Sequence, residues 1–440
     1  TEPHQVQLLS THVHQQGLIY FGSGTTLHHS SAVEDGGGIS ATLCAIEMKN
    51  IFIKNSTTTK GNGGALLLSS DSTLQVTETT TFEKNTAATG SGGAVSCKKC
   101  GSMEFSEGTL FQSNSAHDSG GALHLISPKN PIVSSNSLFI GNTAADGNGG
   151  AVDSYHGTWK SMGDRFELNV AQHGSGGAVS SFGSHLHFDA STSCSKNQAL
   201  EGGGGCILWE PEALNIEDEK WKTFAPVISN MQLIDNNKAG FGVKLATPGA
   251  ALHISKDLDT TQMTTNDEHL LAPKFPKVDI IDKYGSVVQG DLAKDVEIRA
   301  KLFQSEASLF GATVTKADSS GQALFRGLGL QGIPGTSHSM KFESVLADSK
   351  RLLTTSTLLS TRIQVCGENL FLDQNLQQCA KCPVGTTTRQ QVGATNIDQC
   401  HCFERTFGNA SSGCEPCLRH ATCLGSDTLN VWTGYWRSSP

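Results

Sequence analysis

The apolar residues of this 440-residue chain occur in short clusters between polar stretches, most clearly over the first 250 residues. Clusters such as 65–68, 106–111 and 122–126 hold four to six residues and are flanked by Gly, Ser, Thr and Asn. Amphipathic helices need longer runs with a period near 3.6, whereas strands between tight bends have this length and composition. The pattern therefore predicts an all-β protein.

One apolar cluster recurs behind a pair of glycines at a nearly constant interval. The phrase Gly-Gly-Ala followed by Leu, Val or Ile, or a variant of it, begins at Gly36, Gly63, Gly92, Gly120, Gly149, Gly176, Gly204 and Gly240. Successive copies lie 27 to 29 residues apart, except for the last, which lies 36 residues on. Such periods are typical of solenoids, in which each repeat stacks on its neighbour. Three short strands with corners fill one repeat, so we predict a right-handed parallel β-helix of eight turns.

A second motif, Phe-x-x-Asn, keeps the same period. It occurs at Phe52-x-x-Asn55, Phe82-x-x-Asn85, Phe111-x-x-Asn114, Phe139-x-x-Asn142 and Phe166-x-x-Asn169, with weaker copies at Cys194-x-x-Asn197 and Leu233-x-x-Asn236. One Phe per turn is expected to form a column of rings, and one Asn per turn to form a ladder of side-chain amides. The ladder is predicted to include Asn85, Asn114, Asn142, Asn169 and Asn197, with Asn55 at its start.

This pair of motifs resembles the repeats of the chlamydial polymorphic outer-membrane proteins over residues 36–243. Similar repeats also occur in secreted proteins of algae and other protists. The resemblance implies a β-helix on a surface-displayed adhesin. It is specific for the fold and much less so for the function.

Changes in residue composition and in the pattern of apolar residues divide the chain into five parts. We expect residues 1–35 to form an N-terminal cap, 36–265 the β-helix, 266–276 a linker, 277–365 a β-sandwich and 366–440 a cysteine-rich module that continues beyond Pro440. Alternating strand patterns with turn signals between them indicate the sandwich. Its order of motifs resembles the immunoglobulin-like modules of invasin and filamin type.

The cysteine-rich module holds eight cysteines in 75 residues: Cys366, Cys379, Cys382, Cys400, Cys402, Cys414, Cys417 and Cys423. So small a segment cannot build a large core, which favours a disulfide framework. Cys379-Ala-Lys-Cys382-Pro-Val-Gly-Thr386 resembles extracellular ephrin-receptor-like modules. Zinc is the competing explanation, because Cys379-x-x-Cys382 and Cys414-x-x-Cys417 have zinc-finger spacing. The disulfide pairing itself stays open at this level.

The β-helix contains five further cysteines. Cys97 and Cys100 are close enough in sequence to pair, and Cys194 and Cys206 occupy inward-facing places of one turn, where they can bridge. Cys44 is left over.

Two glycosylation sequons are present, at Asn55 and Asn409. If Asn55 belongs to the ladder it is buried and bare, so Asn409 is the expected carrier of a glycan.

Charge and composition narrow the function. The net charge is −9 and no apolar run reaches the length of a membrane span, which argues against a nucleic-acid surface and against a membrane-spanning helix in this chain. Asp153, Asp164 and Arg165 are close enough in the repeat to form a polysaccharide-cleaving site, but we expect a surface salt bridge instead. Alternating histidines such as His185 and His187 are expected at exposed strand positions. No cofactor and no metal are predicted.

Three functions follow, in order. The first is a secreted glycoprotein that associates with itself as the subunit of a surface filament or coat, such as a flagellar hair. The second is an adhesin that binds glycan or protein ligands, for instance through a loop from Trp209 to Trp221. The third is a polysaccharide lyase or hydrolase.

Overall fold

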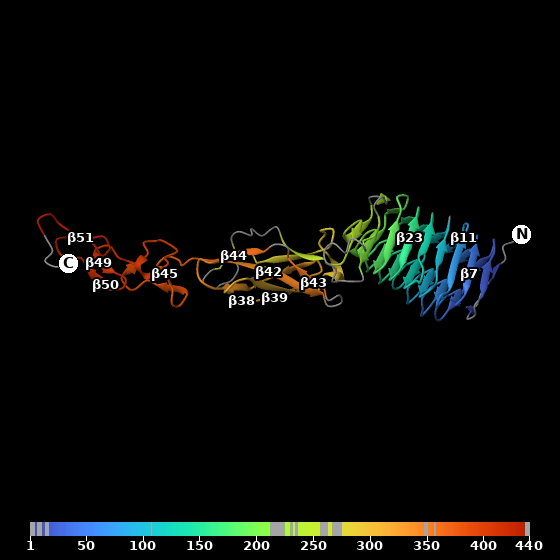
Figure 1. Ribbon diagram of the computed structural model, residues 1–440, viewed down its shortest axis with the longest axis horizontal. Coiled ribbons are helices and arrows are strands. Elements are labelled where there is room, and N and C mark those ends of the chain that lie inside the picture. Colours follow the sequence, from blue (N-terminus) through green and yellow to red (C-terminus); the bar gives the residue numbers. More distant parts are fainter. Residues whose placement is uncertain are drawn as a thin grey trace.

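The structure is a computed structural model that describes residues 5–6, 11–13, 17–106, 108–211, 225–228, 232–233, 236–255, 263–265, 275–346, 351–355 and 358–435. Over these residues the protein is all-β, with two single-turn 3₁₀ segments, η2 (Gly290–Leu292) and η3 (Ile397–Gln399). None of its described helices is long and apolar enough to cross a membrane. Three regions follow one another along the long axis of Figure 1: a parallel β-solenoid, an antiparallel β region and a cysteine-rich region.

The solenoid has about seven turns and four parallel sheets, one more strand per turn than predicted. The first sheet contains β1 (Gln5–Val6), β4 (Thr26–His28), β8 (Phe52–Lys54), β12 (Thr81–Glu83), β16 (Leu110–Gln112), β20 (Leu138–Ile140), β24 (Arg165–Glu167), β28 (Ser193–Ser195) and β31 (Gln232–Leu233). The second contains β2 (Thr11–Val13), β6 (Ile39–Thr42), β10 (Leu66–Ser69), β14 (Val95–Lys98), β18 (Leu123–Ile126), β22 (Val152–Tyr155), β26 (Val179–Phe182), β30 (Ile207–Glu210) and β33 (Leu245–Ala246).

The other two sheets are built from the remaining strands of each turn. The third contains β3 (Leu18–Phe21), β7 (Ala45–Lys49), β11 (Thr73–Thr77), β15 (Met103–Phe105), β19 (Ile132–Ser135), β23 (Thr158–Met162) and β27 (His185–Phe188). The fourth contains β5 (Ser31–Ala32), β9 (Thr57–Thr58), β13 (Thr86–Ala87), β17 (Ser115–Ala116), β21 (Thr143–Ala144), β25 (Val170–Ala171), β29 (Gln198–Gly203) and β32 (Lys238–Phe241). Parallel pairing therefore begins before residue 36, within the stretch expected to be a cap.

The two glycines of each phrase serve different purposes. The first has a positive φ, as at Gly92 (72°) and Gly149 (69°), which a side chain rarely adopts. The second has an ordinary φ, but a Cβ at Gly93 would lie 2.2 Å from the carbonyl oxygen of Gly121 in the next turn. The first glycine permits the corner, and the second permits the close approach of successive turns.

The interior of the solenoid is a continuous apolar core. Val95, Leu123 and Val152 pair in register and are fully buried. Residues two places along each strand, such as Leu125, return to the same face and are also buried. Each buried aliphatic side chain of this kind stabilises the fold by about 1.5–3 kcal/mol.

The pairing register of the strands shows that two copies of the sequence motifs were assigned to the wrong residues. Thr81 pairs with Phe52 and Phe82 pairs with Ile53, so Ile53 holds the inward place and Phe52 is 37% exposed. At the other end, Leu245 pairs with Ile207, which makes Gly242, and not Gly240, the equivalent of Gly204. Both assignments from sequence were wrong because the motif letters recur one or two residues away from the structural position.

The antiparallel region follows the last turn. Its first sheet contains β34 (Ala251–Ile254), β36 (Lys277–Ile281) and β40 (Gln322–Leu324). A larger sheet contains β35 (Met263–Thr265), β44 (Leu359–Ile363), β42 (Ser337–Leu346), β37 (Glu297–Phe303) and β39 (Val314–Lys316), with β43 (Arg351–Thr354) paired to β42. Its edge strand β35 pairs with β44 in parallel, and the other pairs are antiparallel. Strand β38 (Ser308–Gly311) pairs with β41 (Leu328–Gln331). Strand β34 falls within the predicted β-helix, yet it pairs with β36, so the solenoid pairing ends earlier than residue 265. Most of the expected linker, 266–274, lies outside the described residues.

The solenoid and the antiparallel region share a junction. Leu208, Phe241 and Ala246 of the last turns belong to the same apolar cluster as Ile280 and Val288. Above it, the indole Nε1 of Trp209 donates a hydrogen bond to the Tyr284 hydroxyl at 2.9 Å. This packing joins the last turns of the solenoid to the antiparallel region.

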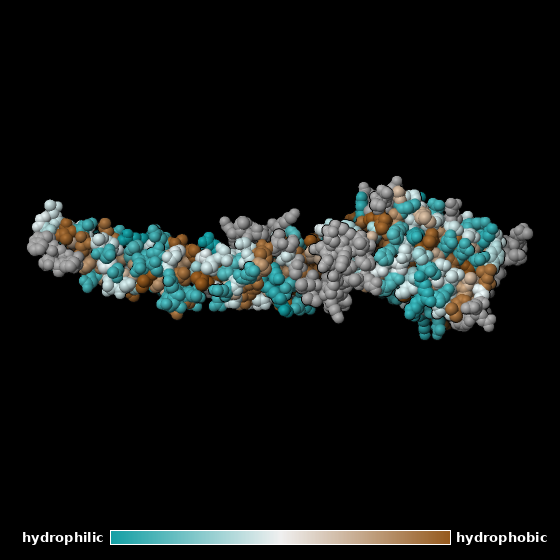
Figure 2. All heavy atoms as spheres, in the orientation of Figure 1, coloured by the Kyte–Doolittle hydropathy of each residue, from teal (hydrophilic) through white to brown (hydrophobic). Residues whose placement is uncertain are grey.

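The cysteine-rich region consists of short hairpins held by disulfides. Its strands are β45 (Leu370–Asp373), β46 (Gln378–Lys381), β47 (Thr386–Thr387), β48 (His401–Cys402), β49 (Thr406–Asn409), β50 (Gly413–Pro416), β51 (Ala421–Cys423) and β52 (Leu429–Val431). On the face shown in Figure 2, hydrophobic residues lie among hydrophilic ones along the whole length of the molecule.

Candidate functional site

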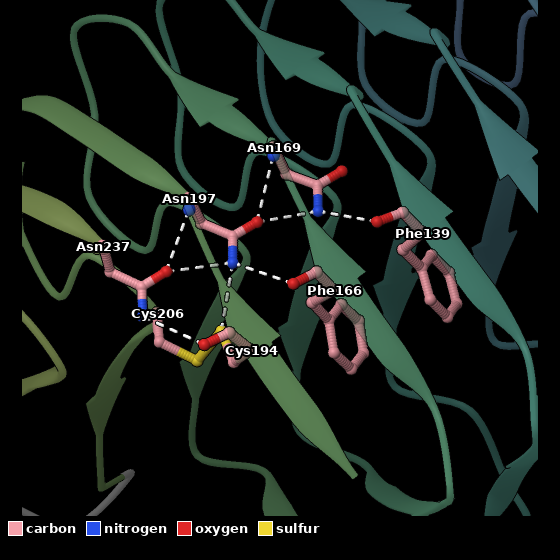
Figure 3. The surroundings of a disulfide bond; sticks show 7 residues. All are labelled: Phe139, Phe166, Asn169, Cys194, Asn197, Cys206 and Asn237. Carbon is pink, nitrogen blue, oxygen red and sulfur yellow. Dashed lines mark hydrogen bonds between the residues drawn. A yellow bond between two sulfur atoms is a disulfide. The ribbon is translucent and has the colours of Figure 1, made fainter. Parts of the chain in front are cut away.

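A ladder of buried asparagines runs along the solenoid, one per turn. Each Oδ1 accepts hydrogen bonds from the backbone N–H and the Nδ2 of the asparagine one turn earlier, at 3.0 Å each for Asn142 and Asn114. The Nδ2 of Asn142 donates to the Phe111 carbonyl and to Asn169 Oδ1. Figure 3 shows the same pattern at Asn169, Asn197 and Asn237. Every side-chain donor and both acceptor sites of such an amide are used, so a row of buried polar groups is tolerated in the core.

The ladder occupies Asn85, Asn114, Asn142, Asn169, Asn197 and Asn237. Its start and end differ from the sequence-based assignment. Ser56, and not Asn55, donates its backbone N–H to Asn85, and Asn237 takes the place predicted for Asn236. Asn55 instead has a φ of 53° and is half-buried, so the argument that it is buried and bare fails.

The inward rings form a column beside this ladder. The centroids of Phe82, Phe111, Phe139 and Phe166 are 4.8–4.9 Å apart, with interplanar angles of 6–9°. Cys194 takes the next place and is bonded to Cys206, as Figure 3 shows. The disulfide thus follows the last ring of the column.

The other cysteines, except Cys44, also form disulfides. Cys97 bonds to Cys100 within the solenoid. The pairs in the cysteine-rich region are Cys366–Cys379, Cys382–Cys400, Cys402–Cys414 and Cys417–Cys423. In the cysteine-rich region, the two members of each Cys-x-x-Cys pair therefore bond to different partners, which does not suit zinc coordination. Buried Cys44 donates its thiol to the Thr42 carbonyl at 3.1 Å.

A second ladder escaped the sequence analysis. The residue immediately before each glycine phrase accepts a hydrogen bond from the backbone N–H of the next turn, as for Asp35 with Asn62 at 2.6 Å and Asn62 with Ser91 at 2.9 Å. The series continues through Ser119, Asn148 and Ser175. The signal was present, because Asp, Asn or Ser precedes six successive phrases.

The aspartates considered for catalysis do not form a site with Arg165. Asp164 is buried and accepts hydrogen bonds from the hydroxyls of Ser134 and Ser161 and from the Ser137 N–H. Burial raises its pKa to about 6, against the effect of these donors. Arg165 forms an ion pair with Glu167 on the surface. Asp164 therefore braces a corner of the solenoid.

Asp153 lies in a different environment, beside His124 of the preceding turn. The two residues pair across β18 and β22, and His124 Nε2 is 3.7 Å from Asp153 Oδ2. Burial raises the pKa of Asp153 to about 7 and lowers the pKa of His124 to about 4. The nearby hydroxyls of Ser180 and Ser119 offset the rise in the Asp153 pKa only in part, and no donor makes a hydrogen bond of normal geometry with either Asp153 oxygen. Desolvation thus favours a neutral pair over an ion pair.

A cleft lies next to this pair, where the solenoid meets the antiparallel region. Its volume is about 630 Å³. Tyr155 and Phe182, equivalent residues of β22 and β26, contribute two half-buried rings with centroids 5.9 Å apart. The Asp153 carboxylate, together with burial, raises the pKa of Tyr155 to about 12, so its hydroxyl stays protonated at neutral pH.

Polar groups surround these rings. The corner after β21 supplies Asp146, β29 supplies Glu201 and β30 supplies Glu210. The segment around η2 supplies Asp291 and Lys294. On the same rim, His173 Nδ1 lies 3.0 Å from Glu201 Oε1. A pocket of this size with aromatic and convergent polar groups has the form of a ligand site. Trp209, expected in an exposed loop, is buried at the junction, and residues 212–224 lie outside the described chain.

Comparison with known families supports the repeat. The model of the Chlamydia polymorphic membrane protein repeat matches residues 79–98, a segment that holds Phe82-x-x-Asn85 and the phrase at Gly92. Comparisons with curated proteins and with solved structures found no match. A β-solenoid with this repeat indicates a surface or adhesin-like protein.

Proposed function

We propose that this protein is a secreted adhesin whose solenoid presents a ligand site on an extended, disulfide-braced stalk. The observation that carries the proposal is the cleft at the end of a solenoid with a membrane-protein repeat. A solenoid suits this role because every turn is hydrogen-bonded to the next, so surface residues are held at fixed spacing.

The stalk comprises the two regions after the solenoid. The antiparallel region has a single apolar cluster and alternating strands, which supports an immunoglobulin-like β-sandwich over about residues 277–365. The cysteine-rich region, with four disulfides, suits an oxidising compartment. Asn409 is exposed on a tight turn and is the favoured site of N-glycosylation. Removal of N-glycans from native material, followed by mass spectrometry, tests that assignment.

Adhesion is tested with the labelled full chain on host or neighbouring cells. We expect saturable binding that excess unlabelled protein abolishes. Binding that never saturates, or that survives competition, contradicts the proposal.

A filament or coat subunit is the second candidate. Among the described strands, β3 is the last of its sheet at the N-terminal end of the solenoid, and its Leu18 and Tyr20 are 61% and 57% exposed. An open strand edge with apolar side chains is a template for association. Electron microscopy of unreduced and reduced native material distinguishes the candidates: regular fibres, lost on reduction, favour the filament, and isolated rods in both favour the adhesin.

A further inference from the structure

The cleft at the junction is built from three sides by parts of the chain that lie far apart in sequence. Its floor is the outer face of β26 and β30, with Ser180 and Leu208. One wall is formed by the corner that holds Ser175 and by β29 with Glu201, and the other is the segment around Asp291. These walls come from different regions that share one apolar cluster, so the cleft exists only when both are folded together.

Two aromatic rings are fixed at one end of this floor. The ring of Tyr155 packs edge-on against His124, at 6.3 Å and 82°, and the ring of Phe182 packs edge-on against His156, at 5.3 Å and 86°. These contacts hold the two side chains in place without a ligand. A rigid pair of rings spaced by one turn of the solenoid is a platform for flat, partly apolar faces, such as those of pyranose rings.

The charge of the cleft restricts what can bind. Its lining contains the carboxylates of Asp146, Glu201, Glu210 and Asp291, against the single ammonium group of Lys294. His173 and His117 contact Glu201 and Asp146, but the carboxylates remain in excess. Carboxylates accept hydrogen bonds from hydroxyl and ammonium groups, and they repel anions. Uronic acids, sulfated glycans and nucleotides are therefore disfavoured.

We infer that this cleft binds a short oligosaccharide without negative charge, with amino sugars bound more tightly than neutral ones. The aromatic pair stacks against sugar rings, and the carboxylates accept hydrogen bonds from hydroxyls and from a protonated amine. The inference rests on the proposed adhesin function and assigns its ligand class and site.

The test is titration calorimetry of the full chain with three probes: chitosan oligomers, N-acetylated chito-oligomers and oligogalacturonate. We expect chitosan to bind most tightly, its acetylated form about tenfold more weakly, and oligogalacturonate not at all. Phe182→Ala should weaken both amino-sugar probes at least tenfold, whereas Phe52→Ala, at an exposed ring outside the cleft, should leave them unchanged. Glu201→Gln, at a surface site, should weaken chitosan and spare the acetylated form.

Several outcomes overturn the inference. The first is tighter binding of oligogalacturonate than of chitosan. The second is equal affinity of Phe182→Ala and the wild type for the amino-sugar probes, when circular dichroism shows that both proteins are folded. The third is binding of a lysine-rich peptide while none of the sugars binds. The cell-adhesion assay separates this inference from the function on which it rests. If the wild type adheres to cells but binds none of the probes, the adhesin function is supported and the glycan site is contradicted. If it binds the probes but does not adhere, the glycan site is supported and the adhesin function is contradicted.

Discussion

At the scale of single residues, the solenoid depends on buried polar groups whose hydrogen bonds pass from turn to turn. Asn142 donates two side-chain hydrogen bonds and accepts two, and it is fully buried. Its neighbours in the ladder are satisfied by the same geometry. The loss of one member therefore leaves unpaired groups in the turns on both sides.

Asn142→Ala should destabilise the protein by about 3 kcal/mol, because it removes four side-chain hydrogen bonds and leaves the Phe111 carbonyl and the Asn114 amide without these partners. Urea denaturation measures the change. Asn130→Ala is the matched control, since Asn130 is exposed and is held through its backbone N–H. Equal stability of the two variants would show that the ladder contributes little.

The pair of His124 and Asp153 predicts an unusual pH dependence. Burial raises the pKa of Asp153 to about 7 and lowers that of His124 to about 4. Between these values the folded pair holds one proton, on Asp153, and the unfolded chain also holds one, on His124. The numbers of bound protons are nearly equal, so this pair should add almost no slope to the stability of the wild type from about pH 4 to pH 6.5.

Single substitutions should reveal opposite slopes. With His124→Gln, the unfolded chain loses the Asp153 proton above pH 4 while the folded chain keeps it, so stability should fall, relative to wild type, as pH rises from about 4 to 7. With Asp153→Asn, the unfolded chain protonates His124 below pH 6.5 and the folded chain does not, so stability should rise over about pH 4 to 6.5. Denaturation midpoints across this range measure both slopes. Curves parallel to the wild type would rule out a neutral buried pair.

At the scale of elements, the corner before each ladder residue sets the direction of the chain. The residue there has a positive φ in successive turns: Asn55, Lys84, Ser113, Gly141, Leu168, Lys196 and Asn236. Glycine adopts this conformation at no steric cost, whereas a side chain costs about 1–2 kcal/mol. Only the turn with Gly141 has glycine among these corner positions, and the other six have side chains in this unfavourable conformation.

Reciprocal substitutions at this corner should have opposite effects. Leu168→Gly should stabilise the protein by about 1 kcal/mol, since Leu168 is 46% exposed and has a φ of 60°. Gly141→Ala should destabilise it by about 1 kcal/mol, because φ is 63° while a Cβ there meets nothing closer than 3.9 Å. Urea midpoints of the two variants test the sign. A stabilised Gly141→Ala variant would contradict this account of the corner.

At the scale of the whole molecule, different forces hold the regions together. The solenoid has a continuous apolar core and a backbone hydrogen-bonded from turn to turn. The cysteine-rich region has few buried apolar residues and four disulfides that close loops of 6 to 18 residues. Each such bond contributes about 2–4 kcal/mol, chiefly through the unfolded state.

Reduction should therefore unfold one end of the molecule and spare the other. With a thiol reductant in hydrogen–deuterium exchange, we expect residues 366–435 to lose protection. Peptides around β10 and β22 in the same sample serve as the internal reference and should remain protected. Loss of protection along the whole chain would mean that the solenoid depends on Cys97–Cys100 and Cys194–Cys206.

The sequence by itself determined the parallel solenoid and its core, because a period of about 28 residues places equivalent side chains on top of one another. It also indicated the inward column at Phe82 and the ladder through Asn114, since stacking groups must recur once per turn. It could not place Phe52, Asn55 or Asn236, because a local shift of one residue keeps the motif letters and moves the side chain to another face.

Tertiary structure alone decided the cleft and the protonation of the buried pair. The cleft joins Tyr155 to Asp291 across regions more than a hundred residues apart, a proximity that no local pattern encodes. His124 and Asp153 are adjacent only because their turns stack in register, and their pKa values follow from the exclusion of water around them. The sequence period predicts the features that recur in every turn, whereas the cleft forms where two differently folded regions pack together.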